Sequence, residues 1–147
     1  MCFIPLNVLS FNGKGCHLLV KANIGGYGFN LLIDSGATLS FFDIERVKKV
    51  YPNSPIKKYN HFCTGIGATE IDAWEVRVEE IVLNDLVINS RDVILIDFTS
   101  LNYAYARFDM PRIDGVIGGD ILWEYRARID YKNKYLELQL PKSPANR

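Results

Sequence analysis

The residue best placed for chemistry is an acid at the end of an apolar stretch. Residues 31–33 are Leu-Leu-Ile, and Asp34, Ser35 and Gly36 follow directly. An ionised carboxylate at the end of a buried strand is costly unless hydrogen bonds satisfy it. The small hydroxyl bonds locally, and the glycine permits a tight turn that aims backbone N–H groups at the carboxylate. On its own, the tripeptide favours the plainer interpretation of an ordinary turn that begins with Asp.

Two later segments add to this pattern. Residues 65–67 are Gly-Ile-Gly, and within residues 113–122 an apolar pair precedes a glycine that opens a short predicted helix. With Asp-Ser-Gly-Ala at residues 34–37, these segments resemble the retropepsin-like aspartic proteases in order and spacing. That family has Asp-Thr/Ser-Gly-Ala after an apolar run, then a flap hairpin, then an apolar pair and glycine before a helix. The resemblance spans roughly residues 18–140, and the segment from residue 120 onward looks most like the bacterial branch.

The resemblance implies a fold and a mechanism. The fold would be all-β with one or two short helices, a single-lobe acid-protease barrel. Two carboxylates held close together share one proton, so one acts as general base on a water while the other protonates the scissile carbonyl. This chain has one Asp-Ser-Gly, because Asp114 is followed by Gly115 and no hydroxyl. The resemblance therefore implies a homodimer in which each chain contributes Asp34.

Other residues take supporting roles by the same resemblance. Ser35 would hydrogen-bond the two active-site loops together across the two-fold axis. Thr38 would either bond near the carboxylate or simply lie on a strand, and Gly118 would let the chain pass close behind the Asp34 loop. The predicted support residues of the active-site loop are Ser35, Gly36, Ala37, Thr38, Val116, Ile117 and Gly118.

Three features concern access to the site and the dimer. Gly65, Ile66 and Gly67 are predicted to form the flap, with Ile66 over the substrate and the glycines as hinges, unless they form an ordinary glycine turn. Prolines in the tail, after residue 140, would interrupt strand pairing there, which leaves the position of the dimer interface open. The long connection between residues 97 and 113 would cover the cleft, narrow its specificity or block it.

The first half of the chain predicts the elements that position Asp34. Its apolar stretches are short and bounded by turn residues, which indicates strands. Residues 17–24 and 27–33 predict a hairpin around a Gly-Gly turn that ends at Asp34. Asp43 is a plausible N-cap of a short helix that ends before Pro52.

The second half continues the β pattern. Alternating apolar and charged residues from 74 to 79 predict a strand with one buried face, and residues 86–96 predict the next strand or pair. An aromatic-rich connection follows, in which Tyr103, Tyr105 and Phe108 are expected in the core or the cleft wall. One or two helical turns at 120–125 and a closing hairpin complete a single domain over residues 1–140. Residues 141–147 are expected to form a frayed tail.

Composition excludes several classes of function. Seventeen Lys and Arg balance seventeen Asp and Glu in 147 residues, so no global field attracts nucleic acid or an anionic membrane. No leader peptide or membrane span is visible. The three cysteines, Cys2, Cys16 and Cys63, lack metal-site spacing and are expected as small buried apolar residues in a reducing, cytoplasmic compartment. We expect neither a metal nor a cofactor.

The sequence thus predicts an aspartic endopeptidase that acts as a homodimer on peptide or protein substrates. The alternative keeps the fold without the activity: a monomeric or differently paired domain that binds a peptide or a protein partner. A β-domain with a purely structural role is a third interpretation. The first two share Asp34 and its loop, so the residues alone do not separate them.

Overall fold

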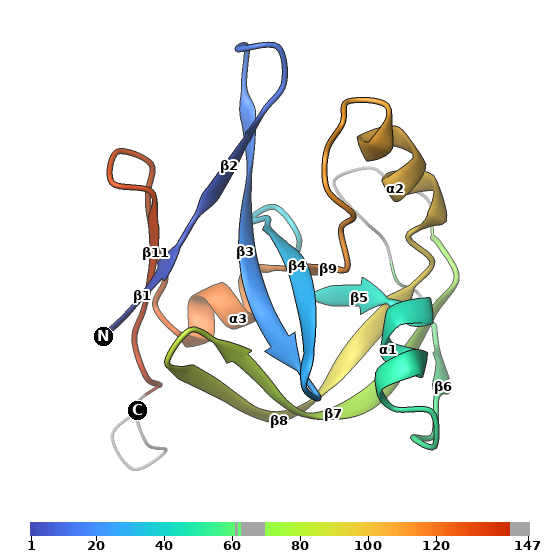
Figure 1. Cartoon of the computed structure of the whole chain (residues 1–147). Helices are drawn as coiled ribbons and strands as arrows, with labels where there is room; N and C mark the ends of the chain where they lie inside the picture. The colour runs from blue at the N-terminus through green and yellow to red at the C-terminus, as the bar shows by residue number, and fades with distance from the viewer. Residues whose placement is uncertain (61, 63–69, 142–147) are drawn as a thin grey trace.

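The chain folds as short strands and a few short helices. The computed structural model describes residues 1–60, 62 and 70–141 (Figure 1). The strands are β1 (Cys2–Pro5), β2 (Asn7–Ser10), β3 (Cys16–Ile24), β4 (Tyr27–Ile33), β5 (Phe41–Asp43), β6 (Lys57–Tyr59), β7 (Ala73–Leu83), β8 (Leu86–Ile96), β9 (Gly115–Ile117), β10 (Arg128–Asp130) and β11 (Tyr135–Leu138). The helices are α1 (Ile44–Val50), α2 (Thr99–Ala106) and α3 (Gly119–Glu124).

Most strands belong to one sheet that closes on itself. Its order is β2-β3-β4-β9-β5-β8-β7-β6, and a further pairing joins β7 back to β3. The strands from β3 to β7 in this order therefore form a closed barrel, which removes most free sheet edges. Neighbouring strands β4 and β9 run parallel, with Ile33 opposite Ile117. The predicted all-β barrel is confirmed.

The predicted hairpin that leads to Asp34 is also confirmed. β3 and β4 pair from Leu19 opposite Leu32 to Ile24 opposite Tyr27. Gly25 and Gly26 connect them with φ values of 59° and 84°. Two consecutive residues at positive φ match the twist of the flanking strands, which is why Gly-Gly selects this tight connection.

The helix after β5 begins and ends where the sequence predicts. α1 has Asp43 as its N-cap, and the Asp43 carboxylate accepts a hydrogen bond from the Glu45 N–H. Ile44 and Val47 pack into the core from its buried side. The last turn carries Lys48 and Lys49, which favour the carboxyl end of a helix dipole.

The expectation of a long loop over residues 98–112 is wrong in part, because the first half of this segment forms helix α2. Asp97 accepts hydrogen bonds from both the N–H and the hydroxyl of Thr99, at 2.8 and 2.6 Å, and so starts the helix. Tyr103 is 72% and Phe108 51% exposed, and neither lines the cavity beside Asp34, so the expectation of a core or cleft position fails for both. Tyr105 on the same helix is buried.

A second, smaller sheet joins the two ends of the described chain. Its order is β1-β11-β10, and β1 and β11 lie side by side in Figure 1. The predicted closing hairpin is confirmed as β10 and β11, with Ile129 opposite Leu136. Within the described residues, β10 has β11 on one side and no strand on the other.

The core divides into two clusters of buried side chains. The larger fills the barrel and includes Phe29, Leu31 and Phe42. The smaller lies toward α2 and includes Leu32, Phe41, Phe62, Phe98, Tyr105 and Val116. In the described part of the chain, no helix is long and apolar enough to cross a membrane.

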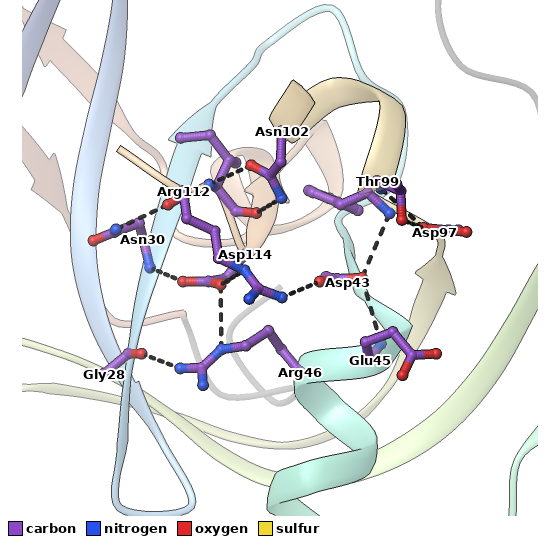
Figure 2. A network of polar contacts seen from close by, with 12 residues as sticks. Gly28, Asn30, Asp43, Glu45, Arg46, Asp97, Thr99, Asn102, Arg112 and Asp114 are labelled. Carbon is purple, nitrogen blue, oxygen red and sulfur yellow. Dashed lines mark hydrogen bonds and ion pairs between the residues drawn. The ribbon is translucent and has the colours of Figure 1, made fainter. Parts of the chain in front are cut away.

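Two buried carboxylates fasten the strands around the start of β9 (Figure 2). Asp114 accepts a hydrogen bond from the Asn30 N–H at 2.9 Å and forms ion pairs with Arg46 at 3.2 Å and Arg112 at 3.4 Å. Arg112 also donates to the buried Asp43 carboxylate at 3.0 Å. These contacts join β4, β5 and α1 to the segment that becomes β9.

We expect Asp114→Ala to destabilise the protein by about 3 kcal/mol, because it removes the buried carboxylate that pairs with Arg46 and accepts from the Asn30 N–H, and it leaves Arg112 with Asp43 as its remaining partner. The free energy of unfolding from urea titration measures this cost. The matched control is Asp92→Ala, which breaks an ion pair with Arg77 whose two side chains are both exposed. The control should cost less than about 1 kcal/mol. Equal costs for the two variants would contradict the structural role of Asp114.

Candidate functional site

Asp34 lies immediately beyond the end of β4, and its side chain is exposed. The Asp34 N–H donates to the Ile117 carbonyl at 3.0 Å, so the strand pairing continues through this residue. Its carbonyl accepts from the Ala37 N–H at 3.1 Å, which closes a turn. The Gly36 N–H then donates to the Asp34 carboxylate at 2.9 Å. The loop thus holds one carboxylate oxygen by a backbone bond and leaves the group open to solvent.

The turn between β9 and α3 lies directly against this loop. The Gly119 N–H donates to the Ala37 carbonyl at 2.6 Å, and the Asp120 N–H donates to the Thr38 carbonyl at 3.1 Å. A Cβ added at Gly118 would lie 2.7 Å from the Ala37 carbonyl oxygen and 2.9 Å from backbone atoms of Leu39. Only a residue without a side chain fits at Gly118.

Ser40 and Asp120 stabilise the contact between this turn and the Asp34 loop. The sequence analysis did not identify either of them as a site residue. The Ser40 hydroxyl donates to the Asp120 carboxylate at 2.7 Å and accepts from the Gly118 N–H at 2.9 Å. The same carboxylate oxygen accepts from the backbone N–H groups of Ser40 and Ile121. The sequence signal that could have indicated Asp120 is its position as an acid in the first turn of a predicted helix, where a negative charge is favourable. Nothing near it in sequence indicates Ser40 as its partner.

The predicted support residues occupy two layers. Ser35, Gly36 and Thr38 are exposed around the carboxylate, whereas Ala37 is buried. Val116, Ile117 and Gly118 are buried behind the loop. The structure therefore brings these residues together around Asp34. The predicted flap residues Gly65, Ile66 and Gly67 lie outside the described residues.

Asp34 opens onto a cavity of about 450 Å³. Strands β3, β4, β5 and β9, helix α2 and the residue that follows β10 contribute its lining, which consists of Cys16, His17, Leu18, Leu32, Ile33, Asp34, Phe41, Leu101, Tyr105, Val116 and Tyr131. Asp34 is the one acid among these described lining residues. The expectation of buried cysteines is wrong for Cys16, because the residue is exposed beside this cavity near the start of β3.

One polar contact links two walls of the cavity. The Tyr105 hydroxyl on α2 hydrogen-bonds to His17 Nδ1 on β3. Phe11 packs against both rings, with its centroid 4.7 Å from that of His17 and 5.9 Å from that of Tyr105. Burial raises the pKa of the Tyr105 phenol, and the nearby Asp34 charge raises it further, so the hydroxyl stays neutral at physiological pH.

Among the described residues, no group of three or more His, Cys, Asp or Glu side chains is arranged to hold a metal ion. The arrangement around Asp34 instead offers an exposed carboxylate beside apolar walls. Such a carboxylate can accept a proton from a water molecule or, when protonated, donate one to a carbonyl oxygen.

Comparisons with known proteins agree with this architecture. A family model described as aspartyl protease matches residues 20–121. Among solved structures, a retropepsin-like aspartic protease from Rickettsia conorii is similar with a TM-score of 0.56 and 14% identity, covering 95% of this chain and 89% of that chain. Among curated proteins, no sequence matches the chain.

Two further solved structures share the fold. EIAV protease, in complex with the inhibitor HBY-793, has a TM-score of 0.56 and 16% identity, over 83% of this chain and 99% of that chain. The retroviral protease-like domain of Ddi1 from Leishmania major has a TM-score of 0.53 and 17% identity, over 88% of this chain and 96% of that chain. At these identities the likeness establishes the retropepsin-like fold and nothing finer.

We expect Gly118→Ala to destabilise the protein by about 1–3 kcal/mol, because the added methyl meets backbone atoms that have no free side chain to move aside. Urea unfolding measures the cost. Gly28→Ala in β4 is the matched control, since an added Cβ there meets nothing within 4 Å. If Gly118→Ala proves as stable as Gly28→Ala, the tight contact behind Asp34 is not required.

Proposed function

This chain belongs to the aspartyl protease family, and from that premise we propose that it is an aspartic endopeptidase whose catalytic acid is Asp34. The observation that carries the proposal is the position of Asp34 as the one acid among the described residues that line an otherwise mostly apolar cavity. A largely apolar cavity of this size, with a few polar groups and one carboxylate, suits a segment of peptide.

Hydrolysis by this route needs two carboxyl groups on one peptide bond. One carboxylate removes a proton from a water, whose oxygen attacks the carbonyl carbon, while the second carboxyl protonates the carbonyl oxygen. The tetrahedral intermediate then collapses as a proton passes to the amide nitrogen and the C–N bond breaks. Two adjacent carboxylates share one proton, so the pair titrates in two separated steps.

The second carboxyl group comes, in this proposal, from a second copy of the chain. The sequence holds a single Asp-Ser-Gly. A two-fold axis would place two Asp34 side chains in equivalent positions, as the symmetric chemistry of a shared proton requires. The exposed Ser35 hydroxyl would then be available to hydrogen-bond across the axis, and Gly118 with its neighbours would support each loop from behind.

The geometry favours β10 as the strand at which two copies meet. Its outer side has no partner strand within the described residues, and an unpaired edge is a template for another strand. Tyr131, the residue after β10, lines the same cavity as Asp34. A second copy that pairs with β10 would therefore lie close to the site that it has to complete.

The charges of β10 suit pairing with itself. The strand is Arg128-Ile129-Asp130, so antiparallel pairing about Ile129 sets each Arg128 opposite the Asp130 of the other copy. Hydrogen bonds from Asn133 lower the pKa of the Asp130 carboxyl, so it is negative at neutral pH as an ordinary carboxyl is, and it stays negative to lower pH. Opposite charges that face each other across two strands are favourable, so this register is self-complementary.

We expect Asp34→Asn to lower kcat/KM for peptide cleavage by at least about 10³-fold, because the amide keeps the shape and the bond from the Gly36 N–H but transfers no proton. Cleavage of a peptide library between acidic and neutral pH measures the loss. Circular dichroism and the urea midpoint should match those of the unchanged chain. Undiminished cleavage by this variant would assign the chemistry to another group.

Mixing experiments test the requirement for two copies. Adding an equal amount of Asp34→Asn chains to active chains should lower the total activity to roughly half, because half of the active chains then pair with an inactive one. Asp92→Asn chains, which retain Asp34, serve as the control and should not lower it. Activity that is insensitive to added Asp34→Asn chains would show that one copy acts alone. Peptide binding without any cleavage by the unchanged chain would favour the non-catalytic alternative.

A further inference from the structure

Helix α2 is an anchored part of the cavity wall. Asn102, in its first half, donates to the Ile113 carbonyl at 3.0 Å and accepts from the Ile113 N–H at 2.7 Å. These two bonds tie the helix to the segment that leads into β9. Asp97 fixes the beginning of the helix through Thr99. The first half of α2 is therefore held in place by both sets of bonds.

Tyr105 is the residue of α2 with the most restricted side chain in this wall. The side chain is buried, and its hydroxyl is hydrogen-bonded to His17 on β3. Phe11 stands edge-on to its ring, and Phe108 packs against Phe11 in turn, with ring centroids 5.5 Å apart. A ring held by a hydrogen bond and by aromatic neighbours does not move aside at low cost.

The rest of the cavity leads from Asp34 to this ring. Leu32, Phe41 and Val116 are buried apolar residues that line it, and all three belong to the same core cluster as Tyr105. A peptide whose scissile bond lies at Asp34 would insert a neighbouring side chain among these residues. That side chain would contact the Tyr105 ring. Because the ring is held in place, it would limit the size of the side chain that fits.

We propose that Tyr105 is a specificity-determining residue, which sets the largest apolar side chain that a peptide can place beside the bond to be cleaved. This inference rests on the proposed function, because it concerns the peptide that Asp34 would act on. The neutral state of the phenol is consistent with it, since burial moves the pKa of Tyr105 further above physiological pH and the ring adds no charge to the wall. An uncharged wall accepts an apolar side chain without the cost of desolvating an ion.

The test is a set of peptides that differ only in one residue beside the cleaved bond, as Ala, Leu, Phe or Trp. Tyr105→Ala should raise kcat/KM for the Trp peptide relative to the Leu peptide by about tenfold, because the space left by the ring admits the larger side chain. Tyr105→Phe keeps the ring and should keep the ranking of the four peptides. Tyr103→Ala, on the exposed side of the same helix, is the matched control and should also keep it.

Tyr105→Leu covers the case in which Tyr105→Ala does not fold. Leucine keeps an apolar side chain of smaller volume than tyrosine, so it should shift the ranking in the same direction. An unchanged ranking in whichever of these two variants folds would overturn the proposal. A change of equal size in Tyr103→Ala would overturn it too, because the effect would then not depend on the cavity.

A binding arm separates this inference from the proposed function. The same four peptides are titrated against Asp34→Asn chains with and without Tyr105→Ala, and Kd is measured by calorimetry. A relative gain for the Trp peptide supports the role of Tyr105 even if the unchanged chain cleaves no peptide, in which case only the proposed function fails. A Kd ranking that is the same with and without the Tyr105 ring overturns the inference.

Discussion

The position of Asp34 depends on one close contact between two distant segments. The loop after Asp34 rests on the turn between β9 and α3, where the Gly119 N–H reaches the Ala37 carbonyl at 2.6 Å and Gly118 has no room for a side chain. With the space behind it filled by backbone, the loop cannot fold inward. The Ser40 hydroxyl pairs with the Asp120 carboxylate and with the Gly118 N–H, so polar groups that this contact buries are hydrogen-bonded.

The same constraint extends to the other end of β9. Strand β9 is short: it pairs with β4 over three residues and with β5 over two. Asp114 supplies a further restraint, because its contacts with Asn30, Arg46 and Arg112 tie the start of β9 to β4 and α1. A buried ionic cluster at one end and a glycine turn at the other therefore define the strand. Asp34 is thus placed by residues about eighty positions away as well as by the local bonds from Gly36 and Ala37.

Sequence patterns predicted the parts of this arrangement that are encoded locally. The Gly25-Gly26 hairpin and the Asp43 cap of α1 were predicted because turn and cap chemistry acts within a few residues. Helix α2 was missed because its aromatic residues lack a regular apolar spacing and its anchor joins Asn102 to Ile113, which lies outside the helix. Ser40 and Asp120 were missed for the same reason, since their bond joins residues far apart in the chain. The neighbours of Asp34 in sequence were therefore predictable, and the groups that hold them were not.

The Asp34 carboxyl group and the unpaired edge of β10 lie near each other, and both lack a partner that the proposed mechanism would supply. Asp34 is one carboxyl group where the proposed chemistry needs two, and β10 presents a strand edge without a partner among the described residues. A single carboxyl group would not carry out the proposed chemistry. A free strand edge can pair nonspecifically with other chains. Tyr131 connects them, since it follows β10 and lines the cavity of Asp34. In the proposed dimer, a single two-fold association through β10 would therefore supply the second carboxyl group and cover the strand edge at the same time.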